Sequence, residues 1–431
     1  MMEIKGIKVK SESEGGISVS DLNARRKRFE DAAALKEPDR VPVCPPMQCW
    51  PILRAGCTMK DALYDFDKGA ECYVKYVLDF EPDQVTGHQH VYMGKGKILE
   101  RMKSKTLIWA GDPKGRVPDN SIHQFVEYPV LLGEEMPFFQ RDYTGWLLEK
   151  GLPKISDLLT PFEGLGVSRL GPSYDQSQVA AAFSAPGVRR AIEELWAIHE
   201  MNEELAKKST ALDDRFEELG FPVMTRGIAM VPFDEYSDFI RGTVDTMIDL
   251  FDHQDLIRKF CDARLEHTLE FIRAQGRFLK GRCVFMPLHK GMDKFMSDEQ
   301  FRDLYWCDLR TIIEEIIKNG MTPYIYTEGP YNSRLPHLTE VPKGKVIFHF
   351  EDVDMAGAKK ILGGTACIAG GFPVWLLEFG TKERVVEECK RLLDACAPGG
   401  GYIFETGCGF DGAKEENVEA MFETVKTLGK Y

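Results

Sequence analysis

Three residues whose side chains are common zinc ligands lie where hydrophobic runs of the sequence end. They are Glu328, His349 and Cys408, which offer a carboxylate oxygen, an imidazole nitrogen and a thiolate sulfur. The runs, each typical of a β-strand, are residues 324–326, 346–350 and 402–404. If these strands are neighbours in a parallel barrel, the three side chains converge at one rim, and the sequence predicts a zinc site there.

Each of these residues also has an interpretation without a metal. Glu328 lies in a turn and could pair with Arg334. His349, inside an apolar run, could be a buried, hydrogen-bonded histidine, and Cys408 lies between two glycines where any small residue would fit. The metal interpretation of all three depends on the barrel.

The order of elements in the second half of the chain is typical of a parallel sheet. A capping box, Ser297 followed three residues later by Gln300, starts a helical run that Gly320 ends. Strands and helices then alternate with short loops. The helices in that alternation are predicted at residues 355–362, 382–395 and 415–428.

Eight strands are predicted along the whole chain, which is the number in a (β/α)8 barrel, or TIM barrel. They lie near residues 41–44, 84–86, 223–225, 283–286, 324–326, 346–350, 366–369 and 402–404. A long segment separates the second strand from the third.

That spacing predicts an α/β protein with three parts. They are a flexible leader at residues 1–24, one TIM-barrel domain at residues 25–431, and an insertion at about 92–220 between the second and third strands. Within the insertion, residues 94–112 are typical of a β-hairpin. A doubly wound open sheet is the alternative, although no Gly-x-Gly-x-x-Gly follows the first strand.

Two further residues at the ends of predicted strands are candidates for catalysis, since a TIM barrel carries its chemistry at the carboxyl ends of its strands. His289 ends the fourth strand and could donate a proton to a leaving phenolate, or be a loop histidine in water. Tyr326 shares one side of its strand with Glu328, so it could line the pocket or donate a hydrogen bond to a substrate oxygen.

Four residues at the same strand ends are candidates for binding substrate. His88 and His90 share one side of the second strand and could form a polar pocket wall or bind a metal. Arg226 follows the third strand and could bind a carboxylate or hydroxyl of the substrate, or form a surface ion pair. Phe372 suits an aromatic guest, although such residues more often pack in the core.

The composition is that of a globular protein and excludes several classes of function. The 431 residues are 43% hydrophobic, and a formal net charge of −13 argues against binding to nucleic acid or to an anionic membrane. No run approaches the roughly 18 apolar residues of a membrane span, and the polar N-terminus lacks an apolar signal core. Eleven cysteines without a CxxC pair argue against a disulfide scaffold or a zinc ribbon. We therefore expect a cytoplasmic protein.

Four segments resemble, in order, those of one known family. Residues 28–43 carry RFEDAAAL and PDRVPV, and residues 319–329 carry NGMTP and end in EG. Residues 354–387 resemble the same family in their glycines and in Leu377. Residues 400–418 resemble it in their glycines and in the segment that ends at Cys408. Together they resemble the uroporphyrinogen decarboxylase superfamily, which includes corrinoid-dependent methyltransferases. The resemblance spans most of residues 25–430 apart from the insertion and implies a TIM barrel.

Two branches of that superfamily match the sequence less well. Its decarboxylases carry Arg-Gln-Ala-Gly-Arg-Tyr after the first strand, whereas residues 44–50 here, CPPMQCW, contain no cation. Its thiol-methylating branch carries His-x-Cys-Gly at the fifth strand, where residues 326–329 here read YTEG. Only the later cysteine of that branch is matched, by Cys408.

The branch that demethylates aromatic ethers, with its Glu…Glu…His zinc pattern, resembles this chain better. Glu328 and His349 match the last two members of that pattern, whereas the nearest upstream carboxylates, Glu314 and Glu315, lie inside a helix and are poorly placed as ligands. With Cys408 as the third ligand, the resemblance implies that zinc polarises the ether oxygen of a methoxylated substrate. The methyl group would pass to Co(I) of a corrinoid on a separate corrinoid protein, because this chain has no Asp-x-His-x-x-Gly.

Three alternatives to this function stay open. They are a metal-free decarboxylase or lyase of the same superfamily, a thiol methyltransferase with a methyl-corrinoid donor, and a non-catalytic binding module. A homodimer is compatible with all of them.

Overall fold

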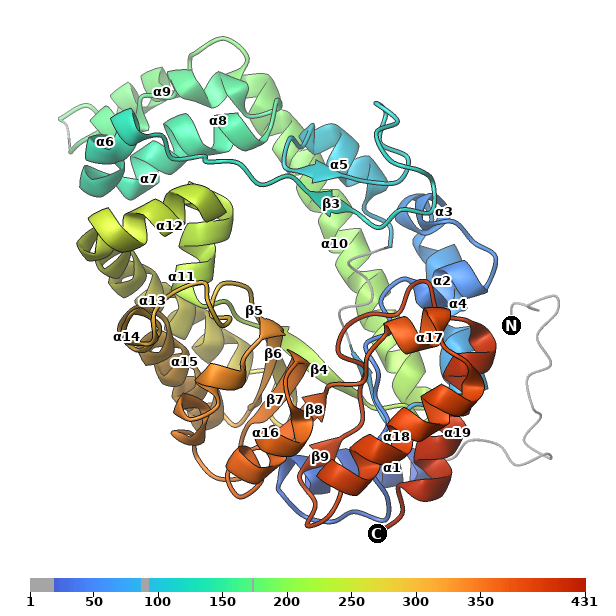
Figure 1. The fold of residues 1–431 in the computed structure, drawn as a ribbon. Helices are drawn as coiled ribbons and strands as arrows, with labels where there is room; N and C mark the ends of the chain where they lie inside the picture. Colours follow the sequence, from blue (N-terminus) through green and yellow to red (C-terminus); the bar gives the residue numbers. More distant parts are fainter. Residues whose placement is uncertain (1–18, 87–92, 173) are drawn as a thin grey trace.

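A curled sheet of seven parallel strands forms the centre of the computed structural model, which describes residues 19–86, 93–172 and 174–431 (Figure 1). From one edge to the other the strands are β1 Val85–Thr86, β4 Val223–Ile228, β5 Cys283–Leu288, β6 Thr322–Pro330, β7 Ile347–Asp352, β8 Cys367–Gly370 and β9 Tyr402–Ile403. They confirm seven of the predicted strands. Because their order in the sheet follows the chain, the carboxyl end of each strand lies beside that of the next.

The first predicted strand, residues 41–44, contacts both edges of this sheet. Val43 forms a parallel bridge with Phe404, which directly follows β9, and the Phe404 amide donates to the Pro42 carbonyl over 2.8 Å. On the other side the Asp83 amide, two residues before β1, donates to the Val43 carbonyl over 3.0 Å. The segment thus joins the two edges of the curled sheet through backbone hydrogen bonds.

A buried carboxylate fixes this junction. Asp83 is fully buried and lies 2.6 Å from Nη1 of Arg28 and 2.6 Å from Nη1 of Arg40. It also accepts a hydrogen bond from the Val43 amide at 2.8 Å. Two cations and a backbone donor compensate the desolvation of the charge, which makes its burial tolerable.

The sheet separates two hydrophobic cores, as strand alternation requires. The larger core lies between the strands and the surrounding helices. The smaller core lines the inner face of the curled sheet. It includes Cys44, Met224, Cys283, Tyr324, Tyr326, Ile347, Cys367, Ala369 and Ile403.

Helices after β4 cover the outer face of the sheet (Figure 1). They include α13 Gln254–Gly276, α15 Cys307–Lys318, α16 Met355–Leu362, α17 Trp375–Phe379, α18 Lys382–Cys396 and α19 Glu415–Leu428. The last three predicted helices are therefore confirmed almost residue for residue.

The predicted capping box is also confirmed. Ser297 Oγ accepts from the Gln300 amide at 3.1 Å, and the Ser297 amide donates back to Gln300 Oε1 at 2.9 Å. This cap opens α14 Asp298–Gln300, which continues through a π-helix, η9 Phe301–Trp306, into α15. Gly320, with a φ of +76°, follows the end of that helix, as its position predicts.

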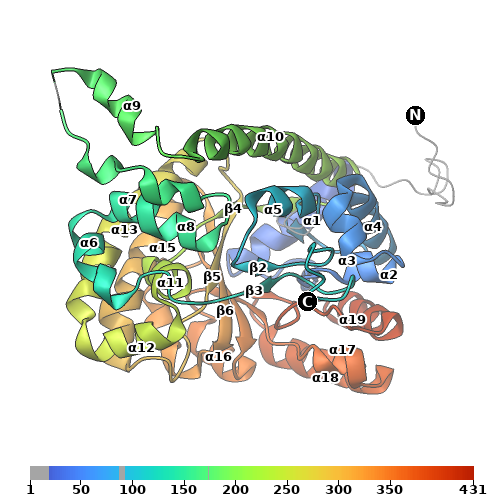
Figure 2. The same ribbon diagram turned by 90° about the horizontal axis from the view of Figure 1, so that it is seen from above.

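The described residues between β1 and β4 are mostly helical, and we call them the β1–β4 segment. Its helices are α5 Gly96–Met102, α6 Met136–Arg141, α7 Tyr143–Trp146, η4 Leu147–Gly151, α8 Leu152–Ile155, α9 Val179–Ala182 and α10 Val188–Glu218. Figure 2 shows α10 as a long rod that passes α5 and α4.

The hairpin predicted at residues 94–112 is wrong. Ile98, Leu99 and Met102 pack against the core from one face of α5, a helical rather than an alternating pattern. The antiparallel pair there is β2 Leu107–Ile108 with β3 Gln124–Phe125.

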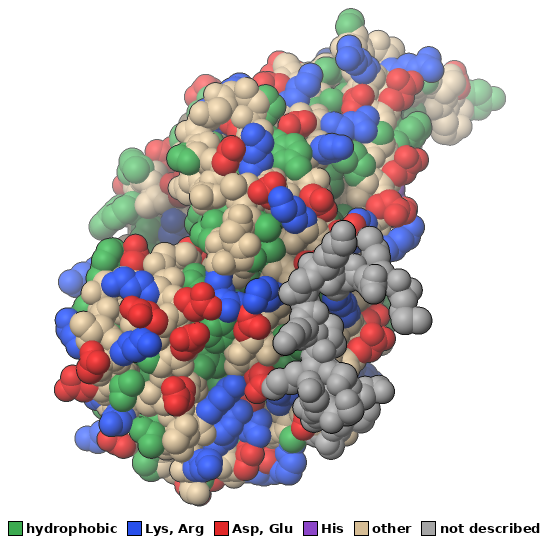
Figure 3. All heavy atoms as spheres, turned by 90° about the vertical axis from the view of Figure 1, so that its right-hand side faces the viewer, with side chains coloured by type: hydrophobic (Ala, Val, Ile, Leu, Met, Phe, Trp, Pro, Cys, Tyr) green, Lys and Arg blue, Asp and Glu red, His purple; other side chains and the backbone are tan. Residues whose placement is uncertain are grey.

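The remaining helices lie before β1 and directly after β4. They are α1 Val19–Ala33, α2 Trp50–Arg54, α3 Met59–Tyr64, α4 Phe66–Phe80, α11 Pro232–Glu235, the π-helix η8 Tyr236–Arg241 and α12 Thr243–Asp252. Among the described helices, none combines the length and apolar character that a membrane span requires. Acidic and basic side chains are interspersed over the face shown in Figure 3.

Candidate active site

The polar side chains at the carboxyl ends of β5, β6 and β7 form a cluster centred on His289. His289 directly follows β5, Glu328 lies near the end of β6, and Glu351 lies near the end of β7. The three strands are consecutive in the sheet, so the parallel topology alone brings these residues to one end of it.

His289 lies between two carboxylates. Its Nδ1 pairs with Oδ2 of Asp238 in η8, and its Nε2 lies 3.7 Å from Oε1 of Glu328. Burial lowers the pKa of His289, but the hydrogen bond that Nδ1 donates to Asp238 and the charges of Asp234, Asp238 and Glu328 outweigh it and raise the pKa to about 9. The imidazole is therefore protonated at neutral pH.

Asp234, in α11, holds the backbone of the loop that carries His289. It is fully buried, and it accepts hydrogen bonds from the amides of His289 at 3.1 Å and Lys290 at 2.9 Å, and from the Tyr305 hydroxyl at 2.6 Å. Burial raises the pKa of Asp234 to about 6, while the positive charge of His289 opposes that rise. These three donors fix the position of the loop relative to α11 and η9.

The β1–β4 segment reaches this cluster through Glu127. Its carboxylate accepts from the Thr243 amide at 2.6 Å and lies 3.6 Å from Nζ of Lys290. Lys290 Nζ also donates to Thr243 Oγ1 at 2.9 Å and lies 3.3 Å from Asp238 Oδ1. The lysine charge is thus shared between two carboxylates.

Glu328 and Cys408 share an acidic environment at the same end of the sheet. The Glu328 side chain is 46% exposed, and burial together with the charge of Glu351 raises its pKa, while His289 lowers it. Burial, then the charges of Glu351, Asp411 and Glu328, raise the pKa of the Cys408 thiol to about 11. Cys408 is therefore a neutral thiol in the absence of a cation.

A backbone contact fixes the turn after Glu328. Glu351 Oε2 accepts a hydrogen bond from the Gly329 amide at 2.6 Å. The strand ends of β6 and β7 are therefore tied together at the site.

His349 lies deeper, on the inner face of the sheet, and both of its ring nitrogens have partners. Nδ1 lies 2.6 Å from Glu405 Oε2 and 3.2 Å from the Tyr324 hydroxyl, and Nε2 lies 2.9 Å from the Gly407 carbonyl. The Tyr326 ring stacks on the imidazole, with centroids 4.3 Å apart. His349 is fully buried.

The three predicted zinc ligands do not form a ready-made metal site. In the described part of the chain, no three His, Cys, Asp or Glu side chains come together in a way that could hold a metal ion. The contact between His349 Nδ1 and Glu405 is the kind that orients a zinc-binding histidine. However, Nε2 faces the Gly407 carbonyl instead of an open position.

Tyr326 lies between the buried His349 and the polar side chains at the carboxyl ends of the strands. Its ring packs against His349 and, with centroids 5.5 Å apart, against Phe285, and its hydroxyl donates to the Gly407 carbonyl at 3.3 Å. Burial, then the charges of Cys408 and Glu328, raise its pKa well above the usual value. Tyr326 therefore stays a neutral phenol that can donate a hydrogen bond.

The predicted substrate-binding residues lie elsewhere or outside the described residues. Arg226 faces α10, where its guanidinium lies 3.5 Å from Asp213 and 3.7 Å from Glu217. Phe372 is fully buried, with its ring 5.7 Å from that of Phe404. His88 and His90 lie outside the described residues. As ligands of a substrate, all four stay predictions.

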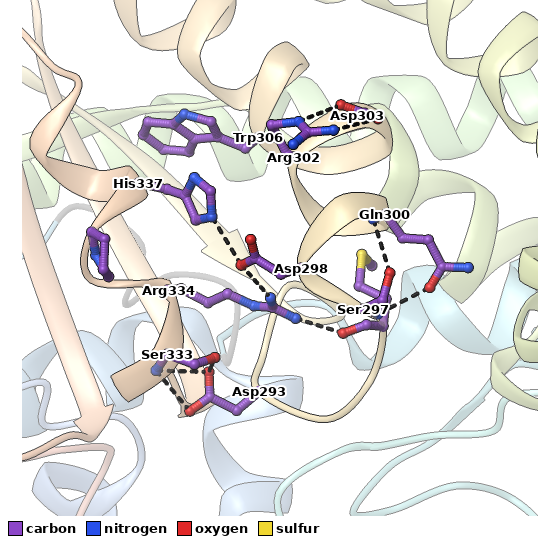
Figure 4. Close-up of polar contacts among 12 residues, drawn as sticks. Asp293, Ser297, Asp298, Gln300, Arg302, Asp303, Trp306, Ser333, Arg334 and His337 are labelled. Carbon is purple, nitrogen blue, oxygen red and sulfur yellow. Dashed lines mark hydrogen bonds and ion pairs between the residues drawn. The ribbon is translucent and has the colours of Figure 1, made fainter.

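Arg334 holds the loops after β5 and β6 together, and its ion-pair partner is Asp298 rather than Glu328 (Figure 4). Its guanidinium donates to the carbonyls of Gly291 at 3.3 Å and Met296 at 2.7 Å, and lies 3.3 Å from Asp298. The clasp fixes the loop that begins at His289 relative to the loop that follows Glu328. Arg334 is therefore not the partner that the interpretation without a metal expects for Glu328.

Sequence reasoning missed Asp234, Asp238 and Glu127. The first two follow β4 at a spacing of one helical turn, so two carboxylates after a predicted strand could have signalled them. No local pattern points to Glu127, because only the tertiary fold brings the β1–β4 segment to Lys290.

Comparisons with known proteins bear on the fold and the family. A solved structure, "methyltransferase from Methanosarcina mazei", superimposes with a TM-score of 0.60 at 14% sequence identity, covering 94% of this chain and 98% of that chain. No curated protein sequence matches this chain. Residues 153–428, more than half of the chain, match the family described as uroporphyrinogen decarboxylase (URO-D). The chain therefore belongs to the uroporphyrinogen decarboxylase family.

Proposed function

We propose that the chain is a methyltransferase that cleaves a methyl ether, such as a methoxylated aromatic, and passes the methyl group to Co(I) of a separate corrinoid protein. The observation that carries the proposal is the position of His289, held by Asp238 and directed at Glu328 where the parallel strands end. The likeness in fold to a methyltransferase supports it.

The residues of the cluster suit the departure of an oxygen leaving group. When the methyl C–O bond breaks, its electron pair stays on the oxygen, and the nucleophile supplies the pair of the new bond to carbon. The His289 imidazolium can give its Nε2 proton to that oxygen, because its pKa of about 9 lies close to that of a phenol. Asp238 holds Nδ1 and so keeps Nε2 directed at the site.

Zinc is part of the proposal, with Glu328, His349 and Cys408 as its ligands. When bound, it would polarise the ether oxygen as a Lewis acid. The contact between His349 and Glu405 supports a ligand role for the histidine, although its Nε2 must first leave the Gly407 carbonyl. The role of His289 does not require the metal.

The fold itself is proposed to be a closed (β/α)8 barrel with an insertion between its second and third strands. The backbone hydrogen bonds of Pro42 and Cys44 to Phe404 at one edge of the sheet, and of Val43 to Asp83 at the other, support closure. The insertion would correspond to the β1–β4 segment, whose Glu127 reaches Lys290.

The test is a methyl-transfer assay with free cob(I)alamin as acceptor and a set of methoxybenzoates as donors. Conversion of cob(I)alamin to methylcobalamin, with release of the matching phenol, would support the proposal. The His289→Gln variant should lose at least about a hundredfold in rate, the usual contribution of a general acid. Release of carbon dioxide without methyl transfer would favour the decarboxylase alternative, and methyl transfer from methylcobalamin to a thiol would favour the thiol methyltransferase.

Metal analysis of the same preparations tests the zinc part separately. About one zinc per chain is expected in the wild type, with loss in each of Glu328→Ala, His349→Ala and Cys408→Ala. Transfer activity in a protein free of zinc would remove the metal from the proposal and leave His289 in place.

A further inference from the structure

A hollow beside α11 and η8 lies between the β1–β4 segment and the helices around the sheet. Its volume is about 430 Å³, within the range of small-molecule sites. The residues that line it include Tyr143 and Trp146 of α7, Met230 after β4, and Phe239 and Ile240 of η8. Figure 1 shows α7 at the end of the molecule that also carries α11, α12 and α13.

One cation, Arg264 of α13, borders this apolar hollow. Its Nε lies 3.0 and 3.1 Å from the two oxygens of Glu235, and its guanidinium carbon lies 5.9 Å from the centre of the Tyr143 ring. Among the described residues, the hydrogen-bonding partner of this guanidinium is Glu235. The pair therefore occupies the Nε edge and leaves the two terminal nitrogens as donors.

Arg264 also borders two adjoining hollows of about 380 and 260 Å³, so it lies where the three meet. A guanidinium fork with free terminal nitrogens matches a carboxylate in a two-point contact. Aromatic walls of the kind formed by Tyr143, Trp146 and Phe239 favour the face or edge of a ring.

We propose that this hollow is a second small-molecule site that binds a single-ring aromatic carboxylate. The carboxylate would lie on the terminal nitrogens of Arg264, and the ring would lie among Tyr143, Met230 and Phe239. This inference does not depend on the reaction proposed above.

The site is next to the active-site cluster without sharing side chains with it. Glu235 and Phe239 border the hollow, whereas Asp234 and Asp238, one residue earlier in each case, contact the loop of His289 and Lys290. The two sites therefore use neighbouring faces of α11 and η8 but different side chains, and variants can separate them.

The test is calorimetric titration of the whole protein with benzoate, and with benzamide as the uncharged analogue of the same shape. Saturable binding at one site per chain is expected below about 10 mM, as suits so small a ligand, with benzamide clearly weaker. Arg264→Gln should weaken benzoate by at least about tenfold, which corresponds to the loss of a charged hydrogen-bond pair. The matched control is Arg273→Gln, on the same helix and paired with Glu266 and Glu315, which should leave the affinity unchanged.

A second variant covers the case in which Arg264→Gln does not fold. Phe239, 44% exposed, can be replaced by Ala at little risk to the fold, and benzoate should then bind about fivefold more weakly. The proposal is overturned if the wild type shows no saturable binding. It is also overturned if Arg264→Gln and Phe239→Ala bind like the wild type, or if His289→Gln abolishes binding and so places benzoate at the other site.

Discussion

His349 Nδ1 lies 2.6 Å from Glu405 Oε2, and both side chains are completely buried on the inner face of the sheet. The Tyr324 hydroxyl also donates to Glu405, whose other oxygen, Oε1, has no hydrogen-bonding partner among the described residues. The interior of the curled sheet thus contains a polar pair directly beneath the cluster of His289, Glu328 and Cys408.

Removal of Glu405 should destabilise the protein strongly. The Glu405→Ala variant leaves His349 and Tyr324 without their buried acceptor, and breaking a buried pair from one side costs about 3–5 kcal/mol. Urea unfolding followed by circular dichroism measures the loss. Glu314→Ala, which removes an exposed carboxylate paired with Arg310, should change stability by less than about 1 kcal/mol. Equal stabilities of the two variants would contradict a structural role for the buried pair.

The stability contributed by His289 should depend on pH. Its pKa is raised from 6.5 to about 9 in the folded chain, so its contribution is present in full below about pH 6.5 and is lost as pH rises through about 9. The contribution is at most about 3 kcal/mol. The difference in free energy of unfolding between wild type and His289→Gln should therefore shrink between pH 6 and pH 10.

His199→Gln, which changes an exposed histidine on α10, is the control for this pH series. It should change the free energy of unfolding by less than about 1 kcal/mol, because its pair with Glu203 is exposed. A difference that stays constant over the pH range for His289→Gln would mean that Asp238 and Glu328 do not hold the imidazole in its charged form.

The clasp at Arg334 should not tolerate lysine. The guanidinium is 2% exposed, donates to two carbonyls, and lies 4.5 Å from the centre of the Phe301 ring, a geometry that an ammonium cannot reproduce. Arg334→Lys should lower the free energy of unfolding by about 2–3 kcal/mol. Arg302→Lys, at an exposed pair with Asp303 in the same region, should have almost no effect (Figure 4).

Gly370, at the end of β8, should be intolerant of any side chain. Its φ is +85°, and an added Cβ would lie 2.3 Å from the Phe350 carbonyl oxygen. Gly56 has a similar φ of +75° with no atom within 4 Å of the same position, so Gly56→Ala isolates the backbone cost of about 1–2 kcal/mol. Thermal unfolding should show a clearly larger loss for Gly370→Ala. Similar losses would mean that the Phe350 backbone can move away.

The strands and the helices that follow them were predictable because local signals agree with the tertiary fold. α16 and α19 match their predicted bounds because their apolar faces repeat at helical spacing. The curled sheet also brings His289, Glu328 and Cys408 to one end, because each lies at or after the carboxyl end of a parallel strand.

The depth and partners of the site residues were not predictable, because they depend on neighbours far away in the sequence. His349 shares the inner face with Glu405, 56 residues later, and no pattern near either residue indicates the pair. Arg226 pairs with Asp213 and Glu217 because α10 passes beside β4, and the register of the sheet is irregular at this arginine.

The bridge between Val43 and Phe404 has a consequence for how the protein is made. A ribosome releases residue 43 long before residue 404, so the early segment has no strand partner on that side for most of the synthesis. Loop-closure entropy makes so distant a pairing slow, and contacts of this kind lower folding rates. The segment around Val43 therefore keeps one side without a strand partner until the residues near Phe404 have been made.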